Sequence, residues 1–329
     1  MAFRGSVSHP VPMRIGIGCC LVLAACGGKS GPEKTAPVPG STAPSAPLIS
    51  RALFAIDANG TRLAYRISGD STKTPVVFIH GTLADSRSWT RQEPGFAQYF
   101  RVLVYSRRYH RPNPQTDDNQ PYSAKLHAED LAALLLTLNF SSAHIVGSGY
   151  GGYIALTLAR EHPDMVRSLI LEEPPIVSLL TGSEAGDPVR RIFFSSALDP
   201  ARAAFARGDS VAGVRAYYDA VTGHGSFDRL PTATRSELVG HAFELRREML
   251  ANREQYYAPI SCAELGRFTK PVLIIRGERS PQVFQLISNE LARCLQSDTT
   301  VIIPGAGHPP HAANPAYFNQ VVARFIMTH

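Results

Sequence analysis

"IVGSGYGGYIAL", residues 145–156, joins the end of an apolar run to a helix-forming sequence through a turn that is rich in glycine. Gly149 lies at the centre of this turn, between Ser148 and Tyr150. Glycine adopts positive φ without steric cost, which a sharp turn between a strand and a helix often requires. The stretch therefore predicts a tight strand-to-helix turn whose central residue carries no side chain.

Apolar runs and helical patterns alternate along most of the chain after residue 51. Short apolar runs bounded by turn residues are typical of buried parallel strands. A leading hairpin precedes them, with Asn59-Gly60 as its turn. The alternation predicts an α/β fold with a mostly parallel, doubly wound sheet, whose active site lies at the carboxyl ends of the strands. The predicted strands are PVVFIH (75–80), RVLVYS (101–106), SAHIVGS (142–148), VRSLILEE (166–173), KPVLIIRGE (270–278) and TTVIIPG (299–305).

Residues 176–258 interrupt this alternation. They hold several helical patterns and no convincing strand, and the interval is too long for a simple crossover between neighbouring strands. We therefore predict a helical cap over 176–258, inserted into an α/β core that consists of residues 51–175 and 259–329.

Residues 1–25 have the features of a signal peptide, because a positively charged start precedes an apolar run that is short for a membrane span. The run ends in LAAC, residues 23–26, which resembles the bacterial lipobox. The resemblance implies that Cys26 carries lipid (palmitate) and becomes the mature N-terminus. Residues 26–50, rich in Pro, Ser and Gly, would then form a flexible tether. We expect a lipid-anchored protein of the bacterial cell envelope, at the outer membrane and facing the periplasm. The alternative is an ordinary signal peptide that ends near a cysteine.

Two cysteines, Cys262 and Cys294, remain in the globular part of the chain. An isolated pair in an oxidising compartment favours a disulfide, and two buried thiols are the alternative. Neither cysteine has the His or Cys neighbours of a metal site. We therefore expect no metal and no cofactor.

The composition is that of a globular protein, with 44% hydrophobic and 18% charged residues. The formal net charge is +6, yet the chain has no block of Lys and Arg. This pattern argues against nucleic acid as a partner. The expected partners are a small-molecule substrate and, through the N-terminal anchor, the lipid membrane.

Several short motifs follow one another in a characteristic order. His80-Gly81 follows a strand, SRRYH stands at 106–110, RGERSP at 276–281, and PGAGH…NP..F runs from 304 to 318. Together with the glycine-rich turn, they resemble the α/β-hydrolase fold over nearly all of residues 52–329. The resemblance implies a nucleophile elbow at 147–151, in which Gly149 occupies the place of the usual serine.

The resemblance also suggests the remaining catalytic groups. His308, in a glycine-rich loop after the last strand, is the candidate general base. Glu173, at the end of the "LEEPP" strand, is the candidate acid that orients His308, and Glu278 is the second choice. Ser148 ends the strand and should point away from His308, so it is the alternative nucleophile only. His311 is expected to be a surface residue.

The oxyanion hole would use the backbone amides of Thr82 and Tyr150, since the family takes one donor after His-Gly and one after the nucleophile. His80, Gly81 and Arg108 are candidate substrate contacts. The arginines of "SRRYHR" could bind an anionic group at an entrance, although arginines at loop bases more often hold the loop in place.

These features predict a hydrolase that acts on a small, largely apolar, ester-like substrate held between core and cap. Because Gly149 has no hydroxyl, a water activated by His308 would attack directly. Two alternatives remain: a catalytically impaired protein that only binds its ligand, and cofactor-free lyase-type chemistry driven by His308.

Overall fold

The computed structural model describes residues 52–296 and 299–329. The predicted signal peptide, the predicted lipidation site Cys26 and the predicted tether lie outside the described residues. None of the described helices has the length and apolar character needed to cross a bilayer.

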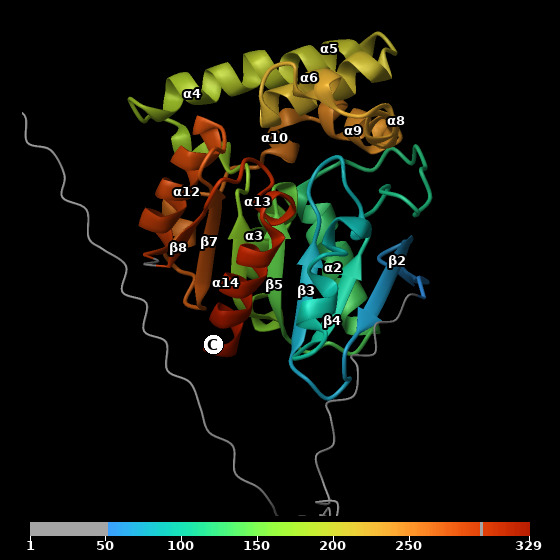
Figure 1. Ribbon diagram of the computed structural model, residues 1–329, viewed down its shortest axis with the longest axis vertical. Coiled ribbons are helices and arrows are strands. Elements are labelled where there is room, and N and C mark those ends of the chain that lie inside the picture. Colours follow the sequence, from blue (N-terminus) through green and yellow to red (C-terminus); the bar gives the residue numbers. More distant parts are fainter. Residues whose placement is uncertain (1–51, 297–298) are drawn as a thin grey trace, which may run out of the picture. The chain divides into compact units, whose positions relative to one another are not determined.

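An eight-stranded sheet forms the centre of the molecule (Figure 1), with the order β1-β2-β4-β3-β5-β6-β7-β8. The β1–β2 and β2–β4 pairs are antiparallel, and the other neighbours are parallel. The predicted mostly parallel sheet is therefore confirmed. The strands are β1 (Phe54–Ala58), β2 (Thr61–Ser68), β3 (Pro75–Ile79), β4 (Arg101–Tyr105), β5 (Ala143–Ser148), β6 (Val166–Glu172), β7 (Val272–Gly277) and β8 (Thr300–Ile303).

Successive residues of a strand point to opposite faces of the sheet, and both faces of the central strands are buried. In β3, Val77 packs into one apolar core, whereas Phe78 packs into the other. The first core is completed by α2 (Ala124–Thr137), α3 (Tyr150–Glu161) and α12 (Gln282–Leu295), and the second by α1 (Glu93–Phe96) and α14 (Pro315–Met327). This two-sided burial explains why the strand sequences are continuous apolar runs.

Between β3 and β4 the chain forms two short helical pieces in place of one longer helix, η1 (Ser86–Trp89) and α1. Pro94 lies in the first turn of α1. A continuous helix would need an N–H from Pro94, and proline has none, so the chain restarts its helix there.

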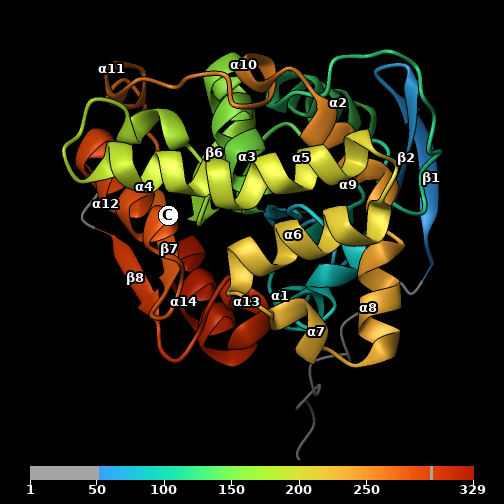
Figure 2. The ribbon, with the colours of Figure 1, turned by 90° about the horizontal axis from the view of Figure 1, so that it is seen from above.

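The chain between β6 and β7 is helical wherever it has regular structure among the described residues. Figures 1 and 2 show α4, α5 and α6 lying across one end of the sheet. The segments are η3 (Val177–Leu180), α4 (Gly186–Phe193), η4 (Phe194–Leu198), α5 (Asp199–Ala206), α6 (Ser210–Thr222), α7 (Ser226–Arg229), α8 (Thr232–Val239), α9 (Ala242–Leu250), α10 (Arg253–Tyr256) and α11 (Cys262–Leu265). We refer to residues 176–258 as the cap.

Two further short helices complete the described chain, η2 (Pro163–Met165) and α13 (Pro310–Ala313). A disulfide joins Cys262, at the start of α11, to Cys294 near the end of α12, with a Cα–Cα distance of 4.9 Å. It links the segment that leads into β7 with the helix that follows β7.

Candidate active site

The turn between β5 and α3 places Gly149 at the carboxyl end of the sheet. Gly149 has φ 52° and ψ −122°, a conformation that L side chains rarely adopt. Its amide donates to the carbonyl of Glu172 in the neighbouring strand at 2.8 Å. The glycines on either side are required by close packing, since a Cβ on Gly151 would lie 2.3 Å from the carbonyl oxygen of Ile79. The turn has the strained geometry that the sequence predicted.

His308 faces Gly149 from the loop after β8. An ideal Cβ built on Gly149 would lie 3.7 Å from Cε1 and 3.8 Å from Nε2 of His308. The imidazole stacks on Phe284 with 4.4 Å between ring centroids, and its Nδ1 is 2.7 Å from Oε2 of Glu173. This arrangement directs Nε2 of His308 towards the space above Gly149.

Glu173 is fixed from several sides. Its side chain is fully buried, its backbone has a positive φ of 47°, and its Oε1 accepts a hydrogen bond from the amide of Gly277 at 2.7 Å. Strain of this kind persists only where the surroundings hold it, and it is concentrated at functional sites. Glu278, the second candidate acid, is exposed and accepts from the amide of Gly305 instead.

The loop after β3 brings Gly81 and Thr82 to the same place. An ideal Cβ on Gly81 would lie 3.0 Å from the carbonyl oxygen of Ser148, so this loop is in close contact with the turn. The guanidinium of Arg107, fully buried, donates to the carbonyl of Gly81 at 2.9 Å. Arg107 therefore holds the loop whose next residue, Thr82, was predicted to supply an oxyanion donor.

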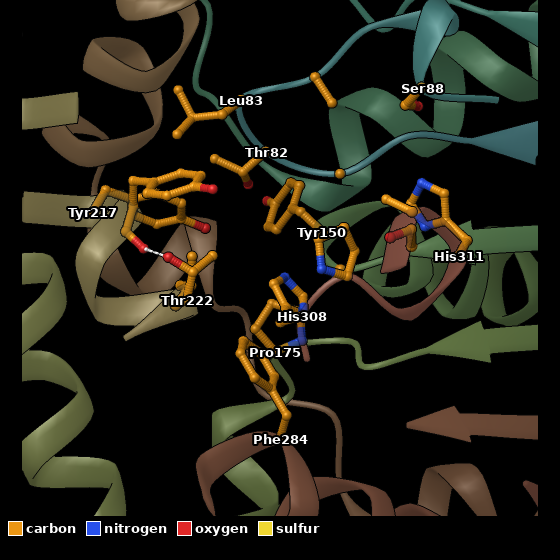
Figure 3. Close-up of a pocket in the computed structure, with 18 of the residues that line it drawn as sticks. Thr82, Leu83, Ser88, Tyr150, Pro175, Tyr217, Thr222, Phe284, His308 and His311 are labelled. Atoms are coloured by element: carbon orange, nitrogen blue, oxygen red, sulfur yellow. Dashed lines mark hydrogen bonds between the residues drawn. The ribbon is translucent and has the colours of Figure 1, made fainter. Parts of the chain in front are cut away.

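A cavity of about 230 Å³ lies between these loops and the cap. Figure 3 shows Thr82, Tyr150 and His308 directed into it, with Tyr217 from the cap and Phe284 from α12 at its sides. Gly81, Ser148 and Gly149 also line it. The predicted elbow, base and oxyanion residues are thus brought together on one cavity, most of whose remaining wall is apolar: Leu83, Phe193, Val221, Leu238 and Tyr257.

Ser148 and His311 form a second hydrogen-bonded group, around Glu172, and both also line the cavity. His311 is buried, which corrects the expectation of a surface residue. Both its backbone amide and its Nδ1 bond to Glu172, at 2.5 and 2.7 Å, and its ring stacks on Trp89. The Ser148 hydroxyl is hydrogen-bonded to Glu172 as well. Burial acts to raise the pKa of Glu172, but the His311 imidazole and these hydrogen bonds outweigh it and lower the pKa.

Two of the predicted substrate contacts are not at the cavity. His80 is fully buried, its Nδ1 is 2.9 Å from the carbonyl oxygen of Gly81, and its Nε2 accepts from the amide of Arg107 at 2.9 Å. Burial lowers the pKa of His80 well below its usual value. Arg108 is bound to Asp130 at 2.5 Å. Both side chains secure the loops that they start from, so the prediction of substrate contact was wrong for His80 and Arg108.

Sequence patterns did not reveal that the cap contributes a buried carboxyl group next to the site. Glu248 of α9 is fully buried and accepts hydrogen bonds from the hydroxyls of Tyr122 and Tyr256, both at 2.9 Å, and from Thr82. Arg107 lies 3.4 Å away. Burial raises the pKa of Glu248 in spite of that cation. A helical pattern cannot show that one of its acids will pair with residues more than 100 positions away.

One group of described residues has the composition of a metal site: His110, His241 and Glu244. However, Nδ1 of His110 lies 2.9 Å from the Ala84 carbonyl oxygen, and its Nε2 lies 3.0 Å from the Tyr122 hydroxyl. Nδ1 of His241 is already paired with Glu244. These ring nitrogens are therefore used by hydrogen bonds within the core and within the cap, and we assign no metal to the group.

Comparison with known proteins agrees with this geometry. The family described as "alpha/beta hydrolase fold" matches residues 74–315. The chain therefore belongs to the α/β-hydrolase family.

Two relatives cover most of the chain. A Bacillus subtilis protein proposed to be a 2-succinyl-6-hydroxy-2,4-cyclohexadiene-1-carboxylate synthase is 25% identical over 273 residues, which are 82% of this chain and 96% of the relative. The sn-1-specific diacylglycerol lipase ABHD11 of Mus musculus is 25% identical over 278 residues, covering 80% of this chain and 85% of the lipase.

Among solved structures, carboxylesterase CesB from Bacillus subtilis superposes with a TM-score of 0.64 at 19% identity, over 84% of this chain and 92% of CesB. The esterase RhEst1 from Rhodococcus sp. gives a TM-score of 0.63 at 23% identity, over 84% of this chain and 98% of the esterase. At these identities, the superpositions establish the fold alone.

Proposed function

We propose that this protein hydrolyses small, largely apolar esters, and that Gly149 stands where the family usually has its serine nucleophile. The separation of Gly149 from His308 carries the proposal. A hydroxyl attached to a Cβ 3.8 Å from Nε2 of His308 would come within hydrogen-bond reach of that nitrogen. His308 and Glu173 are therefore placed as the base and acid of a triad, and Gly149 lacks only the hydroxymethyl group of the serine.

Water is the nucleophile in this proposal. It occupies the space above Gly149, transfers a proton to Nε2 of His308 and attacks the ester carbonyl. Glu173 stabilises the resulting imidazolium through Nδ1. When the tetrahedral intermediate collapses and the ester C–O bond breaks, the imidazolium returns the proton to the leaving alkoxide, which departs as the alcohol. The amides of Thr82 and Tyr150 receive the negative charge that develops on the carbonyl oxygen. Without a covalent intermediate the reaction is slow, because a triad enzyme that lacks its serine retains roughly 10³-fold catalysis over water.

Substitution at Gly149 tests this proposal. We expect Gly149→Ser to raise the hydrolysis of p-nitrophenyl esters by at least about 10²-fold, because nucleophile and base act as a unit. Gly149→Ala is the matched control, since it adds the same Cβ at positive φ without a hydroxyl and should give no gain. Adding His308→Ala to Gly149→Ser should abolish the gain, and Ser148→Ala alone should change little.

The outcomes separate the alternatives. If Ser148→Ala removes the wild-type activity, Ser148 is the nucleophile and the proposal fails. A second outcome is that wild type and His308→Ala are equally inactive, with Gly149→Ser folded but also inactive. That outcome supports the alternative in which the protein binds its ligand without turnover. His308-dependent elimination, without ester cleavage, would support the lyase-type alternative.

We further propose that the mature chain begins at a lipidated Cys26 and is held in the bacterial cell envelope by it. The lipobox-like LAAC sequence supports this proposal. The intact mass of protein extracted from membranes should equal that of residues 26–329 plus lipid. A mature N-terminus at any other residue contradicts it.

A further inference from the structure

A second cavity, of about 720 Å³, adjoins the first at His308. The two cavities share three lining residues, His308, Val221 and Thr222. We call the first the inner chamber and the second the outer chamber. His308 therefore lies at the junction between them, and a ligand longer than the inner chamber extends into the outer one.

Both chambers have largely apolar walls, but they differ in the charged groups that reach them. Aromatic and aliphatic side chains dominate the cap side of the inner chamber, as described above. The outer chamber is lined by Ala212, Ala216 and Pro281 and, in addition, by polar and charged residues: Ser196, Arg215, Asp219, His224 and Arg279. A molecule that occupies both chambers therefore meets charged side chains in the outer one.

Arg279 is an exposed cation on the wall of the outer chamber. Within the described part of the chain, no carboxylate lies within ion-pair distance of its guanidinium. The nearby acids have other partners, because Asp219 accepts from the amide of Phe227 at 2.7 Å and Asp228 pairs with Arg215 at 3.0 Å. Arg279 is thus the cation of this chamber that has no counter-charge.

The position of Arg279 fits a ligand that passes His308. A Cβ built on Gly305 would lie 3.1 Å from an Nη of Arg279, so the guanidinium lies against the loop that carries His308. A planar guanidinium binds a carboxylate or phosphate through two parallel hydrogen bonds.

We propose that the ligand is an anionic amphiphile. Its apolar end fills the inner chamber, and its carboxylate or phosphate binds Arg279 in the outer chamber. If the ligand is also a substrate, its ester lies at His308, between the two chambers, and this part rests on the proposed function. The anion site at Arg279 does not depend on it.

Two ether probes test the anion site without any turnover. 4-Butoxybenzoate and 4-butoxybenzamide have nearly the same size and differ in charge at one end, and neither contains an ester. Because a hydrogen bond between two charged groups is stronger than a neutral one, while solvent weakens an exposed ion pair, we expect the wild type to bind the benzoate at least about 5-fold more tightly. Isothermal titration calorimetry gives both Kd values.

Arg279→Gln should bring the two Kd values together, whereas Arg324→Gln, at an exposed arginine of α14, should keep the wild-type preference. The preference should also fall in about 0.5 M NaCl, because salt screens an exposed ion pair. Equal Kd values in the wild type, or a preference that survives Arg279→Gln, would overturn the proposal.

Turnover is measured separately with the butyrate esters of 4-hydroxybenzoate and of methyl 4-hydroxybenzoate. If neither ester is cleaved above the His308→Ala background while the ether preference stands, hydrolysis fails and the anion site stands. If both esters are cleaved with equal kcat/KM and the ethers bind equally, the anion site fails and hydrolysis stands.

Discussion

Two neighbouring glutamates at the end of β6 each bind Nδ1 of a histidine at 2.7 Å, but the two histidines have different surroundings. The His308 side chain is 14% exposed and opens on the space above Gly149. The His311 side chain is 4% exposed, and Glu172 binds its backbone amide too. The same pair of residue types thus supplies a reactive nitrogen in one case and anchors the His308 loop in the other.

The largest difference should appear in catalysis. In the Gly149→Ser background, we expect Glu173→Gln to lower ester hydrolysis by at least about 10³-fold, because an amide no longer fixes the tautomer of the base. Glu172→Gln should lower it less than about tenfold, since Glu172 does not touch His308. Steady-state kcat on one p-nitrophenyl ester measures both. Comparable losses in the two variants would erase the distinction.

Stability should respond in the opposite sense. We expect His311→Ala to lower the free energy of unfolding by about 3 kcal/mol, because Glu172 is left buried without its partner. His308→Ala should cost less than about 1 kcal/mol, since water from the cavity can reach Glu173. Urea unfolding followed by circular dichroism gives both values. A greater loss in His308→Ala would show that the exposed pair is the structural one.

Acid sensitivity distinguishes the anchoring pair further. Folding lowers the pKa of Glu172 from its ordinary value of 4.5. The ionised Glu172 therefore contributes fully to stability above pH 4.5, and this contribution is lost as the pH falls through the lowered pKa of the folded state. Below pH 4.5, the unfolding free energy of the wild type should therefore decline more steeply with falling pH than that of Glu172→Gln. Urea titrations at several acid pH values test this. Parallel curves would remove Glu172 as a source of acid sensitivity.

The smallest effect should come from the ring beneath His311. Trp89 is fully buried, and its Nε1 has no hydrogen-bond partner among the described residues. Trp89→Phe therefore removes packing but no hydrogen bond, and we expect a loss of about 1 to 2 kcal/mol in unfolding free energy. Ester hydrolysis should be unchanged. A large fall in kcat would mean that the packing of His311 also sets the position of His308.

The sequence was sufficient to predict the parts of the fold that depend on local pattern. Continuous apolar runs identified the central strands, and the glycines around 149 identified the turn, because packing and positive φ restrict both to few residue types. Strand alternation indicated that Glu172 and Glu173 point to opposite faces, and Glu173 was chosen because it adjoins the turn and matches the "EPP" of the family it resembles. The structure places Glu173, and not Glu172, next to His308.

The remaining features depend on contacts between distant segments. His311 looked exposed because its partners, Trp89 and Glu172, are separated from it by more than a hundred residues. His80 looked like a substrate contact because its neighbour Gly81 lines the cavity, but both its ring nitrogens are used within the protein. Burial of a polar side chain is decided by whether a partner reaches it, and one sequence does not show this.

The burial of Glu248 has a consequence for how molecules enter and leave. Moving α9 away from the core would break the contacts of the Glu248 carboxylate with Arg107 and Tyr122. Breaking a buried ion pair in this way costs about 3 to 5 kcal/mol. This cost opposes any opening of the cap that moves α9. The outer chamber, which lies between α6 and the His308 loop, leads to His308 without disturbing the contacts of Glu248.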